Sequence, residues 1–208
     1  MIGRLYSRFV FPVIADYALS RPHIAERRKA ALAQAAGRIL EIGFGSGLNL
    51  AHYPPGVRKI STVEPNAGMT KLARKRIAAS GMEIEIHHST GAAIPYGEGE
   101  FDSVVCTWTL CSVDDLAGVM GEVGRVLKPG GRFLFLEHGA SGNPKTKKWQ
   151  DRLTPINRII ADGCHLNRDI PAIVESGGLK IVRLEKSTLE NAPSVMGNIY
   201  MGVAEKEK

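Results

Sequence analysis

Short apolar segments alternate along the chain with longer segments whose apolar residues recur at helical spacing. The apolar segments predict seven strands, at residues 38–42, 59–63, 83–88, 103–107, 132–137, 179–186 and 198–204. The segments between them predict helices, at residues 21–36, 48–52, 67–79, 114–127, 149–161 and 169–175. Such alternation is typical of parallel α/β folds. The pattern therefore predicts an α/β fold, with a doubly wound seven-stranded sheet and helices on both faces.

Local signals mark where these elements begin and end. Gly37 ends the first predicted helix, and Asp114 is the N-cap candidate of the helix at 114–127. Residues 37–208 are predicted to form the α/β domain, which closes with a hairpin, and residues 1–36 a separate N-terminal helical lid. In doubly wound sheets, ligands bind at the carboxyl ends of the strands, where the strand order reverses.

Basic residues exceed acidic ones along the chain, which gives a formal charge of +6 over 208 residues. They cluster at 27–29, 71–76 and 145–148. We favour solvated helix faces and a basic loop for these clusters, and the alternative is attraction to an anionic membrane or nucleic acid. Aromatic residues are few and are not interleaved with the clusters, as stacking on single-stranded nucleic acid requires. We therefore expect no nucleic-acid partner.

The chain has three cysteines, Cys106, Cys111 and Cys164, without CxxC spacing. This pattern argues against a disulfide framework and against a structural zinc site. Cys106 lies in an apolar strand, so we expect it in the core. No group of His, Asp and Glu residues has metal-ligand spacing either, and the sequence predicts no metal site. A reducing, cytoplasmic setting fits this cysteine usage best.

The N-terminal segment, residues 1–19, mixes Arg4, Arg8 and Asp16 into apolar sequence. It has no apolar run of membrane-spanning length and lacks the cleavage signature of a signal peptide. We expect an amphipathic helix that packs over the ligand site as a lid. The alternative is weak peripheral contact of residues 1–20 with a membrane surface.

A glycine-rich loop follows the first predicted strand. Gly43, Gly45 and Gly47 lie between that strand and the next helix. Glycine lets the backbone turn tightly and lets a ligand approach without a Cβ in the way. Alone, such a loop is typical of a nucleotide site or of a structural turn. Its GxGxG spacing differs from the GxGxxG of dinucleotide sites.

Two acids flank this loop and change its interpretation. Glu41 lies two residues before Gly43, and Glu64 ends the second predicted strand. Glu41 suits a cofactor with a cationic ammonium rather than a pyrophosphate. Glu64 can accept both hydroxyls of a ribose, which we favour, or it can interact with the N-terminus of the helix after Pro65. The loop and both acids together indicate S-adenosylmethionine.

Later motifs resemble those of class I S-adenosylmethionine-dependent methyltransferases. They are residues 91–96 (GAAIPY), 101–105 (FDSVV) and 122–131 (EVGRVLKPGG), and the resemblance runs from about residue 37 to 137. It implies a Rossmann-like fold. In these enzymes an acidic residue after the third strand usually contacts the adenine amino group. The corresponding position in this chain is Ser89, Thr90 or Gly91, none of which is acidic. The implied cofactor contacts are Glu41, Gly43, Gly45, Gly47, Asn49, Glu64, Pro65, Met69, Thr90, Gly91, Ala92, Thr107 and Cys111.

A narrower resemblance is to the methyltransferase-like seven family, the alkyl-thiol S-methyltransferases. It covers roughly residues 38–204 and implies transfer of a methyl group to a small thiol, as small as sulfide or methanethiol. Eukaryotic members carry an N-terminal hydrophobic anchor, where this chain has only residues 1–19. The matching segments are 53–56 (YPPG), 105–113 (VCTWTLCSV), 137–138 (EH), 162–168 (DGCHLNR) and 199–202 (IYMG).

The catalytic side of the site is predicted from topology and this resemblance. His138 is the first candidate for a base or orienter, because imidazole titrates near neutrality, and the alternative is a strand-end histidine bonded to a carbonyl. Asp162 is the second candidate, or it orients a helix N-terminus. We expect Cys111 to form pocket wall rather than act as a nucleophile. The expected substrate-pocket residues are Trp108, Glu137, Cys164, His165 and Arg168.

Two other functions stay open beside the transfer of a methyl group to a small-molecule thiol. The basic charge and the N-terminal segment suggest a membrane-associated methyltransferase that acts on a phospholipid amine or another small nitrogen or oxygen acceptor. The cofactor motifs alone also allow a binding protein without catalysis. The sequence leaves the oligomeric state and the physiological acceptor open.

Overall fold

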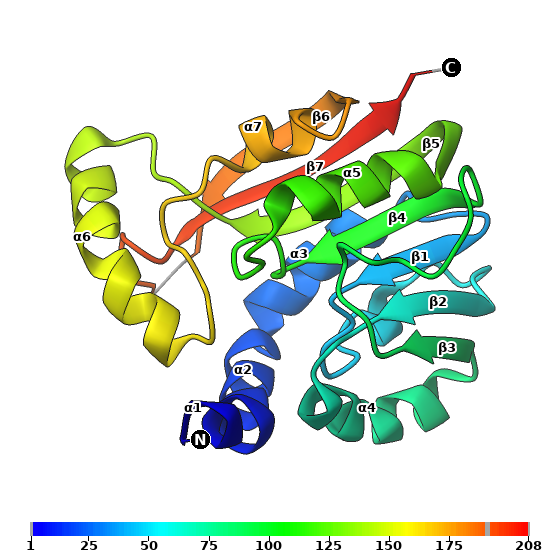
Figure 1. Ribbon diagram of the computed structural model, residues 1–208, viewed down its shortest axis with the longest axis horizontal. Coiled ribbons are helices and arrows are strands. Elements are labelled where there is room, and N and C mark those ends of the chain that lie inside the picture. The colour runs from blue at the N-terminus through cyan, green and yellow to red at the C-terminus, as the bar shows by residue number, and fades with distance from the viewer. Residues whose placement is uncertain (1, 190–191, 208) are drawn as a thin grey trace.

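A seven-stranded mixed sheet forms the centre of the computed structural model, which describes residues 2–189 and 192–207. Its order is β3-β2-β1-β4-β5-β7-β6. The strands are β1 (Ile39–Ile42), β2 (Lys59–Val63), β3 (Glu83–His87), β4 (Phe101–Thr107), β5 (Leu127–His138), β6 (Leu179–Thr188) and β7 (Asn198–Lys206). Strands β1 to β5 are parallel, and β7 is antiparallel to both neighbours. The predicted doubly wound, seven-stranded fold is confirmed (Figure 1).

Helices cover both faces of this sheet (Figure 1). Helices α5 (Leu116–Val126) and α7 (Ile170–Glu175) pack on one face, and α3 (Pro22–Leu32) and α4 (Ala67–Ser80) pack on the other. The remaining helical segments are α1 (Ile2–Leu5), the π-helix η1 (Tyr6–Val10), α2 (Phe11–Leu19), the 3-10 helix η2 (Leu50–His52) and α6 (Pro144–Ile160). Within the described part of the chain, no helix has the length and apolar character to cross a membrane.

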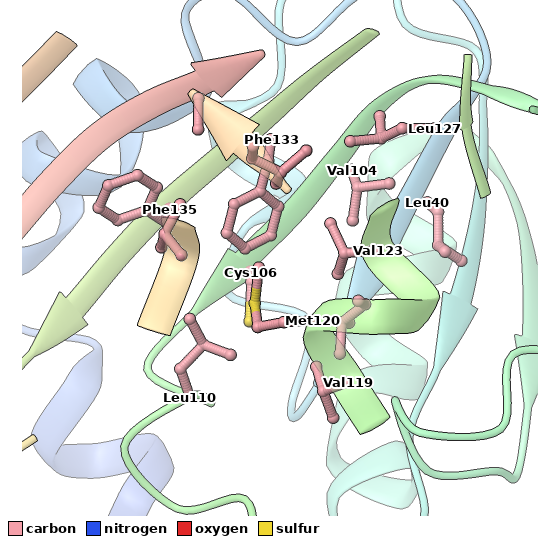
Figure 2. Packing of buried hydrophobic residues seen from close by; sticks show 14 of the residues in the cluster. Leu40, Val104, Cys106, Leu110, Val119, Met120, Val123, Leu127, Phe133 and Phe135 are labelled. Carbon is pink, nitrogen blue, oxygen red and sulfur yellow. The ribbon is translucent and has the colours of Figure 1, made fainter. Parts of the chain in front are cut away.

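Alternation along β5 builds the apolar clusters on the two faces. Phe133 and Phe135 join the cluster under α5 and stack with 5.8 Å between their ring centroids, whereas Leu134 joins the opposite cluster. Figure 2 shows both rings beside Cys106 and Met120. Cys106 is fully buried in this cluster, so the prediction that it lies in the core is confirmed.

Several predicted boundaries were wrong. Residues 144–148, predicted as part of a basic loop, form the start of α6, because the Asn143 side chain caps the helix at its first turn. Asp115, one residue after the predicted Asp114, caps α5. Strand β5 begins at Leu127, five residues before the predicted strand at 132. Each error concerns an end rather than the existence of an element.

The N-terminal helices divide into two parts. Helix α3 belongs to the α/β layers, since Ala31 and Leu32 are buried in apolar clusters with β5. Helix α2 instead lies near the carboxyl ends of the central strands (Figure 1). The predicted division at residue 36 therefore places α3 with the lid, although α3 packs as part of the core. A lid function for α1 to α2 stays a prediction.

Candidate active site

A cavity of about 440 Å³ lies at the carboxyl ends of β1, β2 and β4. Strands β1 and β4 are neighbours at the point where the strand order reverses, which is where doubly wound folds bind ligands. Three predicted cofactor contacts, Gly47, Asn49 and Cys111, are not among the wall residues. The predicted contacts on the wall are Glu41, Gly43, Gly45, Glu64, Pro65, Met69, Thr90, Gly91, Ala92 and Thr107.

The glycine loop needs its glycines for two different reasons. Gly43, Gly45 and Gly47 have φ values of +73°, +58° and +76°. A Cβ at Gly43 would clash with the Thr109 side chain, and one at Gly47 would press on Leu50 at 3.2 Å. A Cβ at Gly45 would instead meet only the Gly43 carbonyl oxygen, at 3.9 Å. Gly43 and Gly47 thus serve packing, and Gly45 leaves the backbone open to a ligand.

Glu41 lies on the cavity wall within a buried polar network. Its carboxylate accepts hydrogen bonds from Tyr53 Oη at 2.7 Å and from Asn49 Nδ2 at 2.9 Å. Burial raises the pKa of Glu41 to about 7, against these two hydrogen bonds. The carboxylate therefore gains its charge near neutrality, and a cation beside it favours the charged form. Asn49 acts by holding Glu41 rather than by forming the wall.

Arg28 is a cavity residue that the sequence analysis missed. We predicted that residues 27–29 form a solvated basic cluster, but Arg28 is 4% exposed and lies on the wall. Its guanidinium donates to Asn49 Oδ1 at 2.7 Å and to Thr107 Oγ1 at 2.9 Å. Burial lowers the pKa of Arg28 to about 10. The available signal was helical spacing, because Arg28 follows buried Ile24 by one turn.

Glu64 supports the glycine loop from its other side. Its carboxylate accepts hydrogen bonds from the backbone N–H groups of Gly45 and Asn66, both at 2.8 Å. Asn66 is the N-cap of α4, so Glu64 serves the helix N-terminus, as the structural alternative predicted. It also lies on the cavity wall and keeps lone pairs for ribose hydroxyls. Burial raises the pKa of Glu64, against both backbone hydrogen bonds.

The adenine end of the predicted site lacks an acid at the usual position. Of the three residues predicted to replace it, Thr90 and Gly91 lie on the wall and Ser89 does not. Ser89 Oγ is buried and has no hydrogen-bond partner among the described residues. A Cβ at Gly91 would lie 2.8 Å from Ile42 Cγ2 and 3.2 Å from Val119 Cγ2, so packing also requires this glycine.

Helix α2 covers the cavity and is tied to the glycine loop. Asp16 accepts hydrogen bonds from Ser46 Oγ at 2.5 Å and from Arg76 Nη1 at 2.7 Å. These bonds link α2 to the loop after β1 and to α4. The position is the one that a lid requires. The α2 residues on the wall are Phe11, Ala15, Asp16 and Leu19.

Trp108 and Asp162 reach the wall from backbone positions that side chains rarely adopt. Their φ values are +56° and +46°, and they are the two non-glycine residues with positive φ within residues 2–189 and 192–207. Such conformations persist where the surrounding structure enforces them, often at functional sites. Asp162 also accepts a hydrogen bond from Ser7 Oγ at 2.7 Å. Of the two predicted catalytic residues, Asp162 is the one on the cavity wall.

Glu137, predicted to lie in the substrate pocket, supports the wall without being part of it. Its buried carboxylate accepts hydrogen bonds from the backbone N–H groups of Thr109 at 2.9 Å, Leu110 at 3.0 Å and Cys111 at 3.3 Å. Burial raises the pKa of Glu137, and these hydrogen bonds oppose the shift. Glu137 therefore fixes the loop that presents Trp108 and Thr109 to the cavity.

His138, the first candidate for a base, is not among the wall residues. The segment between α6 and α7 covers this end of β5, so His138 is 5% exposed and its Nδ1 lies 3.5 Å from Cys164 Sγ. Cys164, His165 and Arg168 were predicted in the substrate pocket, and they also lie outside the wall. The His165 N–H donates to the Cys111 carbonyl oxygen at 2.8 Å, which binds this covering segment to the loop after β4.

The residues of the cavity wall fit S-adenosylmethionine. Arg28 is the one basic side chain on the described wall, so a ligand with an ammonium and a sulfonium group meets a net negative surface. When bound, S-adenosylmethionine supplies an electrophilic methyl group. The fold and this site define a Rossmann-like, class I methyltransferase. The acidic wall residues are Asp16, Glu41, Glu64, Asp114, Asp115 and Asp162.

Comparisons with known proteins place the chain more closely. Residues 40–135 match a family described as methyltransferase domain. Human thiol S-methyltransferase TMT1A is 35% identical over 152 residues, which cover 71% of this chain and 62% of the human protein. Human thiol S-methyltransferase TMT1B is 32% identical over 180 residues, which cover 80% of this chain and 72% of the human protein.

A solved structure of a putative methyltransferase from Bacillus halodurans superimposes with a TM-score of 0.71, at 17% identity, over 87% of this chain and 98% of that one. This likeness shows the fold. The chain belongs to the class I S-adenosylmethionine-dependent methyltransferases, in the family of the thiol S-methyltransferases TMT1A and TMT1B. Both resemblances found in the sequence are thereby confirmed.

Proposed function

We propose that this enzyme transfers the methyl group to the sulfur of a small thiol, as small as sulfide or methanethiol. The observation that carries the proposal is the 32–37% identity to proteins named thiol S-methyltransferases. The chain spans about three fifths of the length of several of them, for example 62% of human TMT1A.

The chemistry of the cavity wall supports a thiol acceptor. The described residues of the cavity wall include no histidine and no lysine. A thiol with a pKa of about 8.5 is already a few per cent ionised at neutral pH, so it needs no strong base. An amine or alcohol acceptor would depend more on a base. The described wall residues therefore act by positioning the acceptor in line with the methyl group and by excluding water.

A panel of acceptors tests this proposal. We expect S-adenosylhomocysteine to form with methanethiol and sulfide at least tenfold faster than with a primary amine or a phenol of similar size. The rate with thiols should rise between pH ~7 and pH ~8.5, as the thiolate fraction increases. The Glu64→Ala variant controls for contaminating methyltransferases. Turnover with amines or phenols, and none with any thiol, would contradict a thiol acceptor.

We also propose a cytoplasmic enzyme with weak peripheral membrane contact. Tyr6 Oη donates to the Ile160 carbonyl oxygen at 2.6 Å, which joins η1 to the end of α6. Exposed Arg8 and Lys148 add positive charge that suits an anionic lipid surface. Three free cysteines suit a reducing compartment. The exposed large apolar side chains on α1, η1, α2 and α6 are Leu5, Phe9, Val10, Val13, Ile14, Tyr17, Trp149, Ile156, Ile159 and Ile160.

Co-sedimentation with vesicles tests the membrane contact. We expect the protein to sediment with vesicles of phosphatidylcholine and phosphatidylserine, less so at high salt, and a Val13→Ser/Ile159→Ser variant to remain in the supernatant. Val182→Ser removes a similarly exposed apolar side chain from β6 and should leave sedimentation unchanged. Equal sedimentation of both variants and wild type would contradict contact through this surface. Methylation of phosphatidylethanolamine in the vesicles would favour the lipid acceptor instead.

A further inference from the structure

Cys111, His138 and Cys164 form a cluster of soft ligands beside the cavity wall. Cys111 lies in the loop after β4, His138 ends β5, and Cys164 lies between α6 and α7. One potential ligand atom from each residue lies within 4.8 Å of the other two. Cys111 and His138 are buried, and Cys164 is partly exposed. Three segments that are distant in sequence thus bring two thiols and an imidazole to one point.

The spacing of these atoms suits a tetrahedral ion. With Zn–S of about 2.3 Å and Zn–N of about 2.0–2.1 Å, tetrahedral angles place sulfur and nitrogen about 3.6 Å apart and two sulfurs about 3.8 Å apart. The observed distance from Cys164 Sγ to His138 Nδ1 is 3.5 Å. The limit of 4.8 Å for the whole group requires at most a small adjustment of Cys111. A single ion can therefore contact all three side chains.

The polar atoms of the cluster have weak partners within the protein. His138 is 5% exposed, and its Nδ1 lies 3.5 Å from the thiol of Cys164, with the Cys111 thiol also nearby. Its Nε2 has no hydrogen-bond partner among the described residues. Cys111 Sγ meets Ser112 Oγ at 3.6 Å. Buried polar groups are almost always satisfied, so a buried imidazole with such partners points to a missing ligand.

The surrounding charges favour a divalent ion. Glu137 accepts three backbone hydrogen bonds beside the cluster, and the Arg168 guanidinium donates to the Leu110 carbonyl oxygen on the same loop. The carboxylate and the guanidinium balance each other. Two thiolates and a neutral imidazole then carry a charge of −2, which a divalent cation neutralises. Thiolate and imidazole ligands suit Zn²⁺ among such ions, whereas Mg²⁺ and Ca²⁺ require oxygen ligands.

We propose that Cys111, His138 and Cys164 bind one divalent thiophilic metal ion, for which Zn²⁺ is the probe. The ion enters past Cys164, and both thiols release their protons to solvent as the metal–sulfur bonds form. Bound there, it fastens the segment that carries Asp162 to the ends of β4 and β5. This proposal departs from the sequence prediction of no metal site. That prediction rested on local spacing, whereas these ligands come from three separate segments and show no CxxC spacing.

Metal titration of the fully reduced protein tests the site. Calorimetry should give one Zn²⁺ per chain with release of about two protons, and Co²⁺ should give the sulfur-to-metal charge-transfer absorption of a thiolate site. Cys164→Ser and His138→Ala should each weaken Zn²⁺ binding at least tenfold. Cys106→Ala is the matched control, because Cys106 is a free cysteine outside the cluster, and its affinity should equal that of wild type.

Circular dichroism and S-adenosylhomocysteine binding establish that each variant is folded. Binding should weaken as the pH falls, because protons compete for the thiolates. A reduced wild-type protein that takes up no Zn²⁺ would overturn the proposal. Uptake that neither Cys164→Ser nor His138→Ala weakens would overturn it too. The proposal would also be overturned if Cys111 and Cys164 form a disulfide on oxidation but bind no Zn²⁺ when reduced. None of these readouts depends on the identity of the methyl acceptor.

Discussion

At the scale of a single residue, Glu64 joins the glycine loop to the N-terminus of α4. It holds Gly45 and Asn66 through backbone hydrogen bonds and lines the cavity with the same carboxylate. We predict that Glu64→Ala weakens S-adenosylmethionine binding at least tenfold, because hydrogen bonds to a charged group contribute about 1.5–3 kcal/mol. Calorimetry measures the dissociation constant. Glu83→Ala, an exposed acid on β3, is the control, and an unchanged constant in Glu64→Ala would remove Glu64 from the site.

Glu41 gives the site a pH dependence. Burial raises the pKa of its carboxyl to about 7, so the group is mostly charged at pH 8 and mostly neutral at pH 6. The charged carboxylate attracts the ammonium group of the cofactor, so replacing Glu41 by an uncharged residue weakens cofactor binding more at high pH than at low pH. We predict that the ratio of dissociation constants, Glu41→Gln over wild type, is several-fold larger at pH 8 than at pH 6. Titration calorimetry at both pH values measures this ratio, and an equal ratio would contradict it.

The site residues that could be predicted from the sequence are those whose role shows in their local spacing along the chain. The loop glycines and the two acids are adjacent to strand ends, so their meeting at one sheet edge was predictable. Arg28 was missed because a basic residue between two others resembles a solvated helix face, and only the packing of α3 buries it. His138 was assigned to the cavity, but a segment more than twenty residues further along the chain covers it.

At the scale of an element, Asp16 attaches helix α2 to the glycine loop and to α4. Burial raises the pKa of Asp16, but hydrogen bonds from Arg76 and Ser46 outweigh this and hold it below its usual value. We predict that Asp16→Ala releases α2 from the glycine loop and weakens cofactor binding about three- to tenfold, as loss of roughly 1 kcal/mol implies. Hydrogen exchange of residues 11–19 should become faster.

Tyr17→Ala provides the matched control for this prediction. Tyr17 is on the same helix but is 66% exposed, so its loss leaves the contacts of Asp16 in place. Equal exchange rates and affinities in Asp16→Ala and Tyr17→Ala would show that α2 does not depend on Asp16. The existence of helices and strands was predicted from periodicity, whereas this attachment was not. It joins residues that are thirty and sixty positions apart.

The cavity couples ligand binding to stability at the scale of the whole molecule. Its wall combines side chains from β1, β2, β4 and α2, so unfolding destroys it completely. A ligand at 100 times its dissociation constant stabilises the folded state by about 2.7 kcal/mol. For a domain of this size, we predict that S-adenosylhomocysteine raises Tm by about 5–11 °C. Differential scanning calorimetry measures the shift, and Glu64→Ala, with an affinity at least tenfold weaker, should lose about half of it or more at the same concentration. No shift in wild type would contradict this cavity as the cofactor site.

Methyl transfer to sulfur is tested most directly by product stoichiometry. S-adenosylmethionine with an isotope-labelled methyl group is incubated with the enzyme and a small thiol, and both products are counted by mass spectrometry. We predict equal amounts of S-adenosylhomocysteine and labelled methyl thioether. With Glu64→Ala we predict several-fold less of both products at an S-adenosylmethionine concentration below the wild-type dissociation constant. S-adenosylhomocysteine without the labelled thioether, or label only on nitrogen or oxygen, would contradict a thiol acceptor.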